Sequence, residues 1–272
     1  MPAPTALVST WDLVADDYLT DIVPHFERFA DAAIALIEDV VSIDGARVAD
    51  VACGPGTFAL LAGKRGATVS ALDFSAAMVA HLRQRADADA VVVDVVVGDG
   101  QALPWRDASF DAAVSMFGLM FFPDRAAGLR ELHRVVRPGG VVVVSSWVPI
   151  DQVPILHDAV TTLMTAAAAP PMPAVTAPLS SPALVRDELE AAGFVDVDVA
   201  ERSVLVPFAS PRAFLEWTVR STAPVVLMKQ RLGDDAFADV FARWDVAMME
   251  KYGAGPVEYP LVALLGSGRR RR

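Results

Sequence analysis

The sequence predicts an α/β protein in which helices cover a mostly parallel sheet of seven strands. Two observations predict this fold. From about residue 45 onward, apolar β-branched runs of strand length alternate with amphipathic stretches of helix length, which is typical of parallel sheets. The apolar runs are also nearly continuous, as in "VVVDVVV" (91–97), and such runs are typical of strands that are buried on both faces.

Length and composition indicate one domain, 1–272. With 272 residues and 54% hydrophobic side chains, the chain can bury a full core. Its mean hydropathy of +0.40 is high, but the apolar runs are far shorter than the ~20 residues of a spanning helix, so no membrane span is predicted. The single cysteine, Cys53, excludes an intrachain disulfide and a cysteine-cluster zinc site. The N-terminus lacks the pattern of a secretory signal, so the predicted location is the cytoplasm.

The charge of the chain argues against a phosphate-rich polymer as a partner. The net charge is −11, so no nucleic-acid partner is predicted, and a small molecule is expected instead. The one basic run, Arg269–Arg272, is interpreted as a frayed tail. The oligomeric state, monomer or homodimer, stays open.

The first half of the chain divides into a helical cap (1–44) and a core (45–148). In the core, Ser75 is the expected N-cap of a helix, and "RPGG" (137–140) is an expected turn. The predicted strands of the core are 46–52, 67–73, 91–98, 110–117 and 141–147, and its predicted helices are 57–66, 75–87 and 124–136.

The alternation changes after the core. Residues 149–180 combine an alanine run with several prolines, which predicts a helix followed by a loop or lid. A helix over 182–192 precedes a strand over 194–208. Residues 207–255 are predicted as a helical insertion that covers the site together with 149–180. The final strand is predicted over 256–268, and it can return antiparallel to its neighbour.

Four segments are expected to meet at the carboxyl edge of the sheet, where open α/β sheets bind ligands. In the first, "DVACGPGTF" (50–58), Gly54 and Gly56 allow a tight turn and leave room for a ligand against the main chain. Asp50 precedes this turn and is a candidate to hold a cationic amine. The second segment ends in Asp73, which can accept both hydroxyls of a ribose, although an acid there also suits a helix dipole.

The third segment is "GDGQALPW" (98–105), and the fourth is "SMFGLMFFP" (115–123). Asp99 can accept a hydrogen bond from an exocyclic amine, and the backbone of Gly100 and Gln101 can bind ring nitrogens. The fourth segment can form the apolar floor of a pocket or part of the core. Because a P-loop lysine is lacking and Ala59 stands where a dinucleotide fingerprint has its third glycine, an adenosine-like ligand with a charged tail is favoured over a pyrophosphate.

In this order, the four motifs resemble those of the class I S-adenosylmethionine-dependent methyltransferases. The resemblance is greatest to the small-molecule branch that includes the ubiquinone and menaquinone biosynthesis enzymes. It covers residues 11–147 strongly, including "ELHRVVRPGGVVVVSSW" before and within the fifth strand, and "GFVDVDV" (193–199) moderately. The resemblance implies a Rossmann-like sheet with an antiparallel last strand, and S-adenosyl-L-methionine as the cofactor.

The resemblance also implies a set of cofactor-binding residues. Tyr18, within "WDLVADDY", would close over the cofactor, Thr57 would line its methionine end, and Phe74 and Met78 would lie beside the adenine. Residues 115–117 would lie under the sulfonium. The complete predicted set is Tyr18, Asp50, Cys53, Gly54, Gly56, Thr57, Asp73, Phe74, Met78, Asp99, Gly100, Gln101, Ser115, Met116 and Phe117.

The function implied is methyl transfer to a small hydrophobic or aromatic acceptor, with O-methylation favoured over N- or C-methylation. If the acceptor must lose a proton, His25 and His157 are candidate bases, although an ordinary surface role also suits both. Two alternatives stay open: an NAD(P)-dependent oxidoreductase on a similar sheet, and a non-catalytic S-adenosylmethionine-binding protein. No Tyr-x-x-x-Lys pair of short-chain reductases is present, and an antiparallel last strand would favour the methyltransferase.

Overall fold

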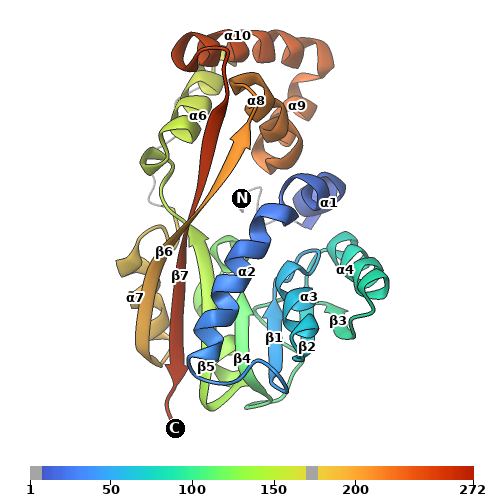
Figure 1. Ribbon diagram of the computed structural model, residues 1–272, viewed down its shortest axis with the longest axis vertical. Coiled ribbons are helices and arrows are strands. Elements are labelled where there is room, and N and C mark those ends of the chain that lie inside the picture. Colours follow the sequence, from blue (N-terminus) through green and yellow to red (C-terminus); the bar gives the residue numbers. More distant parts are fainter. Residues whose placement is uncertain (1–7, 170–176) are drawn as a thin grey trace.

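The computed structural model describes residues 8–169 and 177–272. Its centre is a seven-stranded sheet in the order β3-β2-β1-β4-β5-β7-β6 (Figure 1). The first five strands pair in parallel, and β7 runs antiparallel to both of its neighbours. The predicted fold class, including the antiparallel last strand, is confirmed.

The element bounds agree with the sequence prediction within a few residues. The strands are β1 (Arg47–Val51), β2 (Thr68–Asp73), β3 (Val93–Val97), β4 (Phe110–Ser115), β5 (Val136–Trp147), β6 (Phe194–Phe208) and β7 (Val257–Arg270). The α-helices are α1 (Val8–Asp21), α2 (Val23–Glu38), α3 (Thr57–Lys64), α4 (Ala76–Asp89), α5 (Arg125–Val135), α6 (Pro154–Ala166), α7 (Pro182–Ala191), α8 (Pro211–Ser221), α9 (Ala223–Leu232) and α10 (Asp234–Tyr252). Two short 3₁₀ helices are η2 (Leu119–Phe121) and η3 (Ile150–Gln152).

Burial of apolar side chains on both faces holds the sheet in place. Val142 and Val143 in β5 are fully buried, and full burial of one such side chain contributes about 1.5–3 kcal/mol. Helix α2 buries one apolar stripe, including Phe29, Ile34 and Ile37. Because the strands are covered by helices on both sides, their carboxyl ends form the accessible edge of the sheet.

The predicted turn at 137–140 is wrong, because these residues already belong to β5. The strand register shifts between Phe110 and Ala112, so the chain enters β5 through an irregularity rather than a separate turn. Gly139 has φ +80°, and a Cβ on Gly140 would stand 2.5 Å from the carbonyl oxygen of Asp111. Gly140 therefore allows the close approach of β4 and β5, and Gly139 allows the left-handed backbone beside it.

The predicted frayed tail is also wrong, since β7 continues to Arg270. The Nη1 atom of Arg270 donates to the carbonyl oxygens of His133, Arg134 and Val136, at 3.0, 2.8 and 2.7 Å. The guanidinium thereby satisfies carbonyls at the end of α5, where a helix leaves backbone acceptors without partners.

A second lobe is built on the long β6–β7 pair, which extends beyond the rest of the sheet (Figure 1). Helices α6, α8, α9 and α10 gather around its far end. The indole Nε1 of Trp244 in α10 donates to the carbonyl of Ala159 in α6 at 2.8 Å. The indole Nε1 of Trp217 in α8 donates to the carbonyl of Asp21 at 2.9 Å and so joins this lobe to the end of α1.

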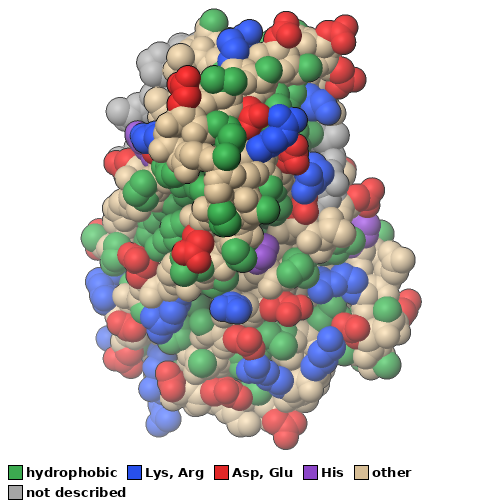
Figure 2. Space-filling model, turned by 45° about the horizontal axis from the view of Figure 1, so that its top comes forward, with side chains coloured by type: hydrophobic (Ala, Val, Ile, Leu, Met, Phe, Trp, Pro, Cys, Tyr) green, Lys and Arg blue, Asp and Glu red, His purple; other side chains and the backbone are tan. Residues whose placement is uncertain are grey.

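The face seen in Figure 2 has no large region of a single charge sign. Acidic and basic side chains are interspersed there, over both lobes (Figure 2). Within 8–169 and 177–272, no helix is long and apolar enough to cross a membrane.

Candidate functional site

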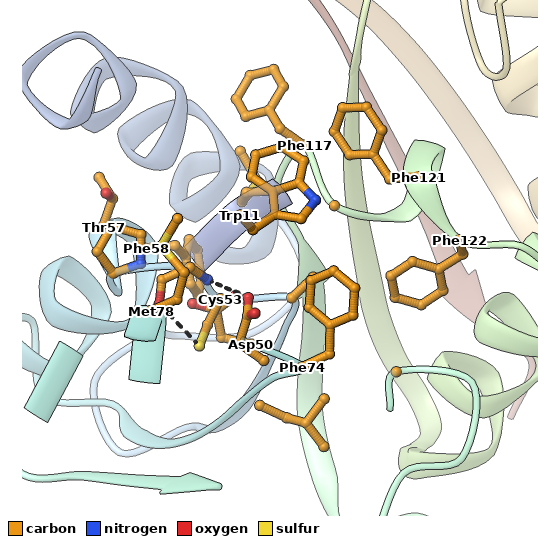
Figure 3. Close-up of a pocket in the computed structure, with 18 of the residues that line it drawn as sticks. Trp11, Asp50, Cys53, Thr57, Phe58, Phe74, Met78, Phe117, Phe121 and Phe122 are labelled. Atoms are coloured by element: carbon orange, nitrogen blue, oxygen red, sulfur yellow. Dashed lines mark hydrogen bonds between the residues drawn. The ribbon is translucent and has the colours of Figure 1, made fainter. Parts of the chain in front are cut away.

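A cavity of about 420 Å³ lies at the carboxyl edge of the sheet (Figure 3). It is bounded by the loops that follow β1, β2, β3 and β4 and by helices α1 and α2. The predicted residues that line it are Asp50, Cys53, Gly54, Thr57, Asp73, Phe74, Met78, Asp99, Gly100, Gln101, Met116 and Phe117. All four predicted segments therefore contribute to one cavity.

The two glycines of the first loop differ in what their missing side chains allow. Gly54 lines the cavity with φ +53°, and no atom lies within 4 Å of the position of a Cβ. Gly56 is the left-handed N-cap of α3, and a Cβ there would stand 2.1 Å from Leu82 Cδ1 of α4. Only Gly54 leaves space at the cavity, whereas Gly56 allows α4 to pack against the loop.

Asp73 fixes the first loop against the end of β2. Its Oδ2 accepts the backbone N–H of Gly54 at 2.8 Å, and its Oδ1 accepts the N–H of Ser75 at 2.9 Å. Burial raises the pKa of Asp73, while the bonds from Ser75 and Gly54 act in the opposite direction. Since each carboxylate oxygen has further lone pairs, Asp73 can still accept hydrogen bonds from a ligand.

Asp50 is a buried acid that lines the same cavity. Neither of its carboxylate oxygens has a hydrogen-bond partner among the described residues. Burial and the nearby Asp73 carboxylate raise the pKa of Asp50 to about 8. A buried polar group without a partner is costly, so this position is suited to a ligand that brings a positive charge or hydrogen-bond donors.

The loop after β3 is held in shape by its own polar groups. Asp99 Oδ1 accepts from both the backbone N–H and the side-chain Nε2 of Gln101, at 2.8 and 2.9 Å. The side-chain Oε1 of Gln101 accepts from the N–H of Asp124 at 2.8 Å. A Cβ on Gly100 would stand 2.4 Å from the Phe122 ring, so this glycine lets the ring approach the loop.

The opposite side of the cavity is aromatic. Figure 3 shows Trp11, Phe117 and Phe121 on one side, across from Asp50. Phe117 has φ +58°, its N–H donates to Ser145 Oγ at 2.9 Å, and its ring stacks on Trp147 at 4.1 Å between centroids. These contacts hold a non-glycine residue in a left-handed conformation, which costs about 1–3 kcal/mol and is concentrated at functional sites.

Sequence reasoning missed much of this aromatic side. The cavity-lining residues outside the predicted set are Val8, Trp11, Phe26, Ala30, Ala52, Pro55, Phe58, Leu72, Gly118, Phe121, Phe122 and Pro123. Helical periodicity predicts that residues of the N-terminal helices are buried, but it does not indicate which of them face a ligand cavity.

Comparisons with known proteins agree with this geometry. Residues 49–144 match the family described as "Methyltransferase domain". The chain is 45% identical over 103 residues to the demethylmenaquinone methyltransferase of Corynebacterium kroppenstedtii, covering 38% of this chain and 42% of that one. It is 42% identical over 103 residues to an uncharacterized protein of Mycobacterium tuberculosis, covering 38% of each chain. The chain thus matches less than half of the length of these curated relatives.

Residues 49–144 therefore have the sequence of a methyltransferase domain. The fold resembles that of the YcgJ protein from Bacillus subtilis, whose crystal structure superposes with a TM-score of 0.58 at 20% identity, covering 89% of this chain and 99% of that one. The matched segment runs from within β1 to within β5, and the four cavity-forming segments lie within it.

Two predicted residues do not line the cavity, and a third lies outside the described side chains. Gly56 packs on Leu82, as described above. Ser115 is fully buried under Gly118, and its Oγ has no hydrogen-bond partner in the described part of the chain. Tyr18 belongs to α1, but its side chain lies outside the described part, so its predicted contact stays a prediction.

The two candidate bases do not line the cavity. His25 is half-buried on α2, and burial, together with nearby Arg28, lowers its pKa. His157 is exposed on α6 in the second lobe. A catalytic role for His25 and His157 stays a prediction, and their positions do not support it.

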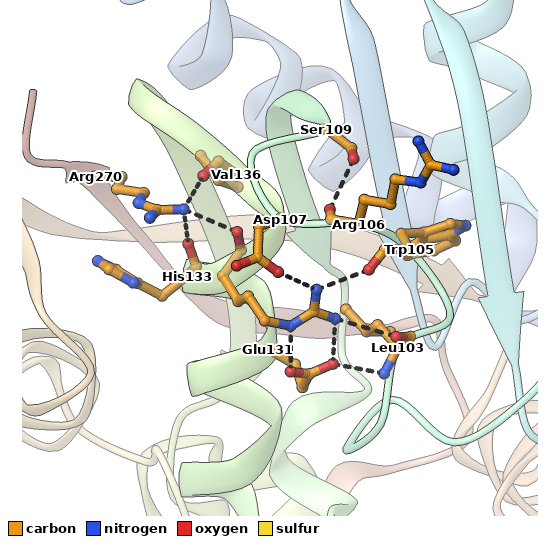
Figure 4. A network of polar contacts seen from close by, with 10 residues as sticks. Leu103, Trp105, Arg106, Asp107, Ser109, Glu131, His133, Val136 and Arg270 are labelled. Carbon is orange, nitrogen blue, oxygen red and sulfur yellow. Dashed lines mark hydrogen bonds and ion pairs between the residues drawn. The ribbon is translucent and has the colours of Figure 1, made fainter.

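A partly buried polar network supports the loop after β3 (Figure 4). Arg134 of α5 donates to both oxygens of Glu131 at 2.7 Å, to Asp107 at 2.8 Å, and to the carbonyls of Leu103 and Trp105 at 3.1 and 2.7 Å. Glu131 in turn accepts the N–H of Leu103 at 2.7 Å. The hydrogen bond from Arg134 lowers the pKa of Glu131. The network anchors the loop that carries Asp99 and Gly100.

Proposed function

We propose that the protein transfers the methyl group of S-adenosyl-L-methionine to a small, hydrophobic or aromatic acceptor molecule. The observation that carries this proposal is the pair Asp50 and Asp73. They lie at the ends of β1 and β2 in one cavity, where Asp50 is buried without a partner and Asp73 is held by backbone N–H groups. Such a pair suits a ligand with both a cationic group and hydroxyl groups.

The lining of the cavity offers a polar group for each part of the cofactor. Asp50 would hold the ammonium group, Asp73 the ribose hydroxyls, and Asp99 the adenine edge. The open space at Gly54 admits the ligand close to the main chain, and Met78 would lie beside the adenine. The cofactor supplies an electrophilic methyl group on a positively charged sulfur.

The protein's own contribution would be alignment and exclusion of water. Phe26, Phe117 and Trp147 pack on one another with ring centroids 4.1–5.6 Å apart, so the aromatic side is a rigid surface against which a planar acceptor can lie. Holding two reactants in line can contribute about 7–11 kcal/mol in favourable cases. The side chains of Phe26, Phe117, Phe121 and Trp11 have no charge to offer, which suits an uncharged acceptor.

The atom methylated is proposed to be oxygen, with carbon and nitrogen as alternatives that product analysis distinguishes. The name of the Corynebacterium relative, a demethylmenaquinone methyltransferase, supports a small cyclic acceptor. The antiparallel pairing of β5 with β7 supports the methyltransferase over a nicotinamide-dependent oxidoreductase.

Segments 149–180 and 207–255 are proposed to cover the acceptor. The proposed location of the protein is the cytoplasm.

Calorimetric titration tests the cofactor first. We expect S-adenosylmethionine to bind wild type, Asp73→Ala to bind at least about tenfold more weakly, and NADH and NADPH not to bind. Binding of a nicotinamide cofactor alone would overturn the proposal.

A panel of phenols, enols and amines, analysed by mass spectrometry, then tests the transfer and identifies the methylated atom. Cofactor binding with no product from any acceptor class would favour the non-catalytic alternative.

A further inference from the structure

Helix α1 presents an apolar face to the cavity. Val8 and Trp11 lie one turn apart on this helix, and both line the cavity. The Trp11 ring lies 5.0 Å from the ring of Phe121, measured between centroids. The cavity is therefore complete only while α1 stays docked over the carboxyl edge of the sheet.

A second face of α1 carries two acids directed toward α4. Asp12 Oδ1 accepts a hydrogen bond from Ser75 Oγ at 2.5 Å. One turn later, Asp16 Oδ1 lies 2.9 Å from His81 Nε2. The side chain of Asp16 is 93% exposed, and a contact made by so exposed a carboxylate contributes little. Asp12, by contrast, has a fully buried hydrogen-bond partner, because Ser75 is fully buried.

Ser75 links Asp12 to the acid of the nucleoside site. The backbone N–H of Ser75 donates to Asp73 Oδ1 at 2.9 Å, and its Oγ accepts the N–H of Met78 at 3.1 Å as the N-cap of α4. A hydroxyl has one proton to donate, and here that proton goes to Asp12. Ser75 therefore contacts α1 through its hydroxyl and Asp73 through its backbone N–H.

We propose that Asp12 is a positioning residue, which acts through Ser75 to hold α1 over the bound cofactor. This inference rests on the proposed function, because it assigns the cofactor to the cavity beside Asp73. It follows that cofactor binding and docking of α1 stabilise each other, because the docked helix supplies Val8 and Trp11 to the cavity wall that the ligand contacts.

Hydrogen exchange of the segment 8–21, with and without S-adenosylhomocysteine, tests the coupling without any methyl transfer. Asp12→Ala removes the acceptor of the Ser75 hydroxyl. Asp16→Ala is the matched control, because it makes the same chemical change on the same helix one turn away. Asp12→Asn keeps an acceptor oxygen at Ser75 and serves as the conservative variant. Thermal melting without ligand checks that each variant is folded.

In wild type we expect the ligand to slow exchange in 8–21. Asp12→Ala should lose this protection and bind the ligand about fivefold more weakly, Asp12→Asn should recover part of both effects, and Asp16→Ala should behave as wild type within twofold. Retained protection in Asp12→Ala, or equal loss in Asp16→Ala, would overturn the assignment to Asp12 while leaving the proposed function intact. No binding of S-adenosylhomocysteine to wild type would instead overturn the proposed function, and this inference with it.

Discussion

The backbone N–H of Gly54 donates to Asp73 Oδ2 at 2.8 Å, which joins the loop after β1 to the end of β2. The same carboxylate receives the N–H of Ser75. One side chain therefore sets the relative position of two loops, and a ligand that binds it meets a site already fixed in shape.

Replacing Asp73 should reduce both stability and cofactor binding. Asp73→Ala leaves the N–H groups of Gly54 and Ser75 without their acceptor, and each buried unsatisfied donor costs about 1–3 kcal/mol. We expect urea unfolding to show a loss of about 2 kcal/mol or more. Asp73→Asn keeps one acceptor oxygen and should lose less. Equal stability of the alanine variant and wild type would contradict the structural role.

The two loop glycines should differ in how far substitution affects stability and ligand binding. Gly56→Ala places a Cβ 2.1 Å from Leu82 Cδ1 at φ +83°, so we expect a stability loss of about 1–3 kcal/mol, as in other overpacked sites. Gly54→Ala meets open space, so it should lose only the smaller cost of a left-handed alanine at φ +53°, about 1–2 kcal/mol, and it should in addition weaken cofactor binding. Thermal melting and calorimetry on both variants separate the two effects. A folded, tight-binding Gly54→Ala protein would show that the ligand does not approach this loop.

Asp50 should give the unliganded protein a distinctive pH dependence. Its pKa in the folded state is about 8, against about 3.9 for an exposed aspartate. Between these values the folded state retains a proton that the unfolded state has lost. The free energy of unfolding should therefore fall as pH rises from about 4 to about 8.

Asp50→Asn has no carboxyl to ionise and should flatten this dependence in urea unfolding measured at several pH values. In wild type, a ligand ammonium that favours the ionised carboxylate should release a proton on binding near pH 7. Calorimetry in buffers of different ionisation enthalpy measures that proton. If the free energy of unfolding of Asp50→Asn fell with pH as steeply as that of wild type, a group other than Asp50 would cause the pH dependence.

Arg270 should contribute to stability although it stands in a run of four arginines. Its guanidinium donates to three carbonyl oxygens at the end of α5, so Arg270→Ala should lower stability by about 1–3 kcal/mol. Arg271→Ala, at the exposed next position along the chain, is the matched control and should change stability by less than about 0.5 kcal/mol. Denaturant unfolding of both variants measures the two stability losses. Equal losses would contradict a specific role of Arg270.

The cofactor side of the cavity was largely predictable because its groups lie in short, contiguous segments. Asp50, Gly54 and Asp73 stand at strand ends, and parallel strands bring their carboxyl ends to one edge whatever the details of packing. The N-cap role of Ser75 was predictable for the same reason, since it depends on residues within one turn.

The aromatic side was not predictable in this way. Trp11 and Phe26 reach the cavity from α1 and α2, and their placement depends on how these helices cross the sheet. The Arg134 network joins residues up to 31 positions apart. No local sequence pattern distinguishes Arg134 from a solvent-exposed arginine, so the network could not be predicted. His25 and His157 show the converse: their residue type suggested chemistry, but their helices direct them elsewhere.

By itself, then, the sequence determined the alternation of strands and helices, the antiparallel return of the last strand, and the acids at the strand ends, because each depends on local periodicity and strand direction. Only the tertiary structure decided that Gly56 serves the packing of α4, that Arg270 caps α5, and that Asp12 reaches Ser75. These contacts join residues that are distant in sequence, and their energies depend on burial and on distances that arise only when the whole chain has packed.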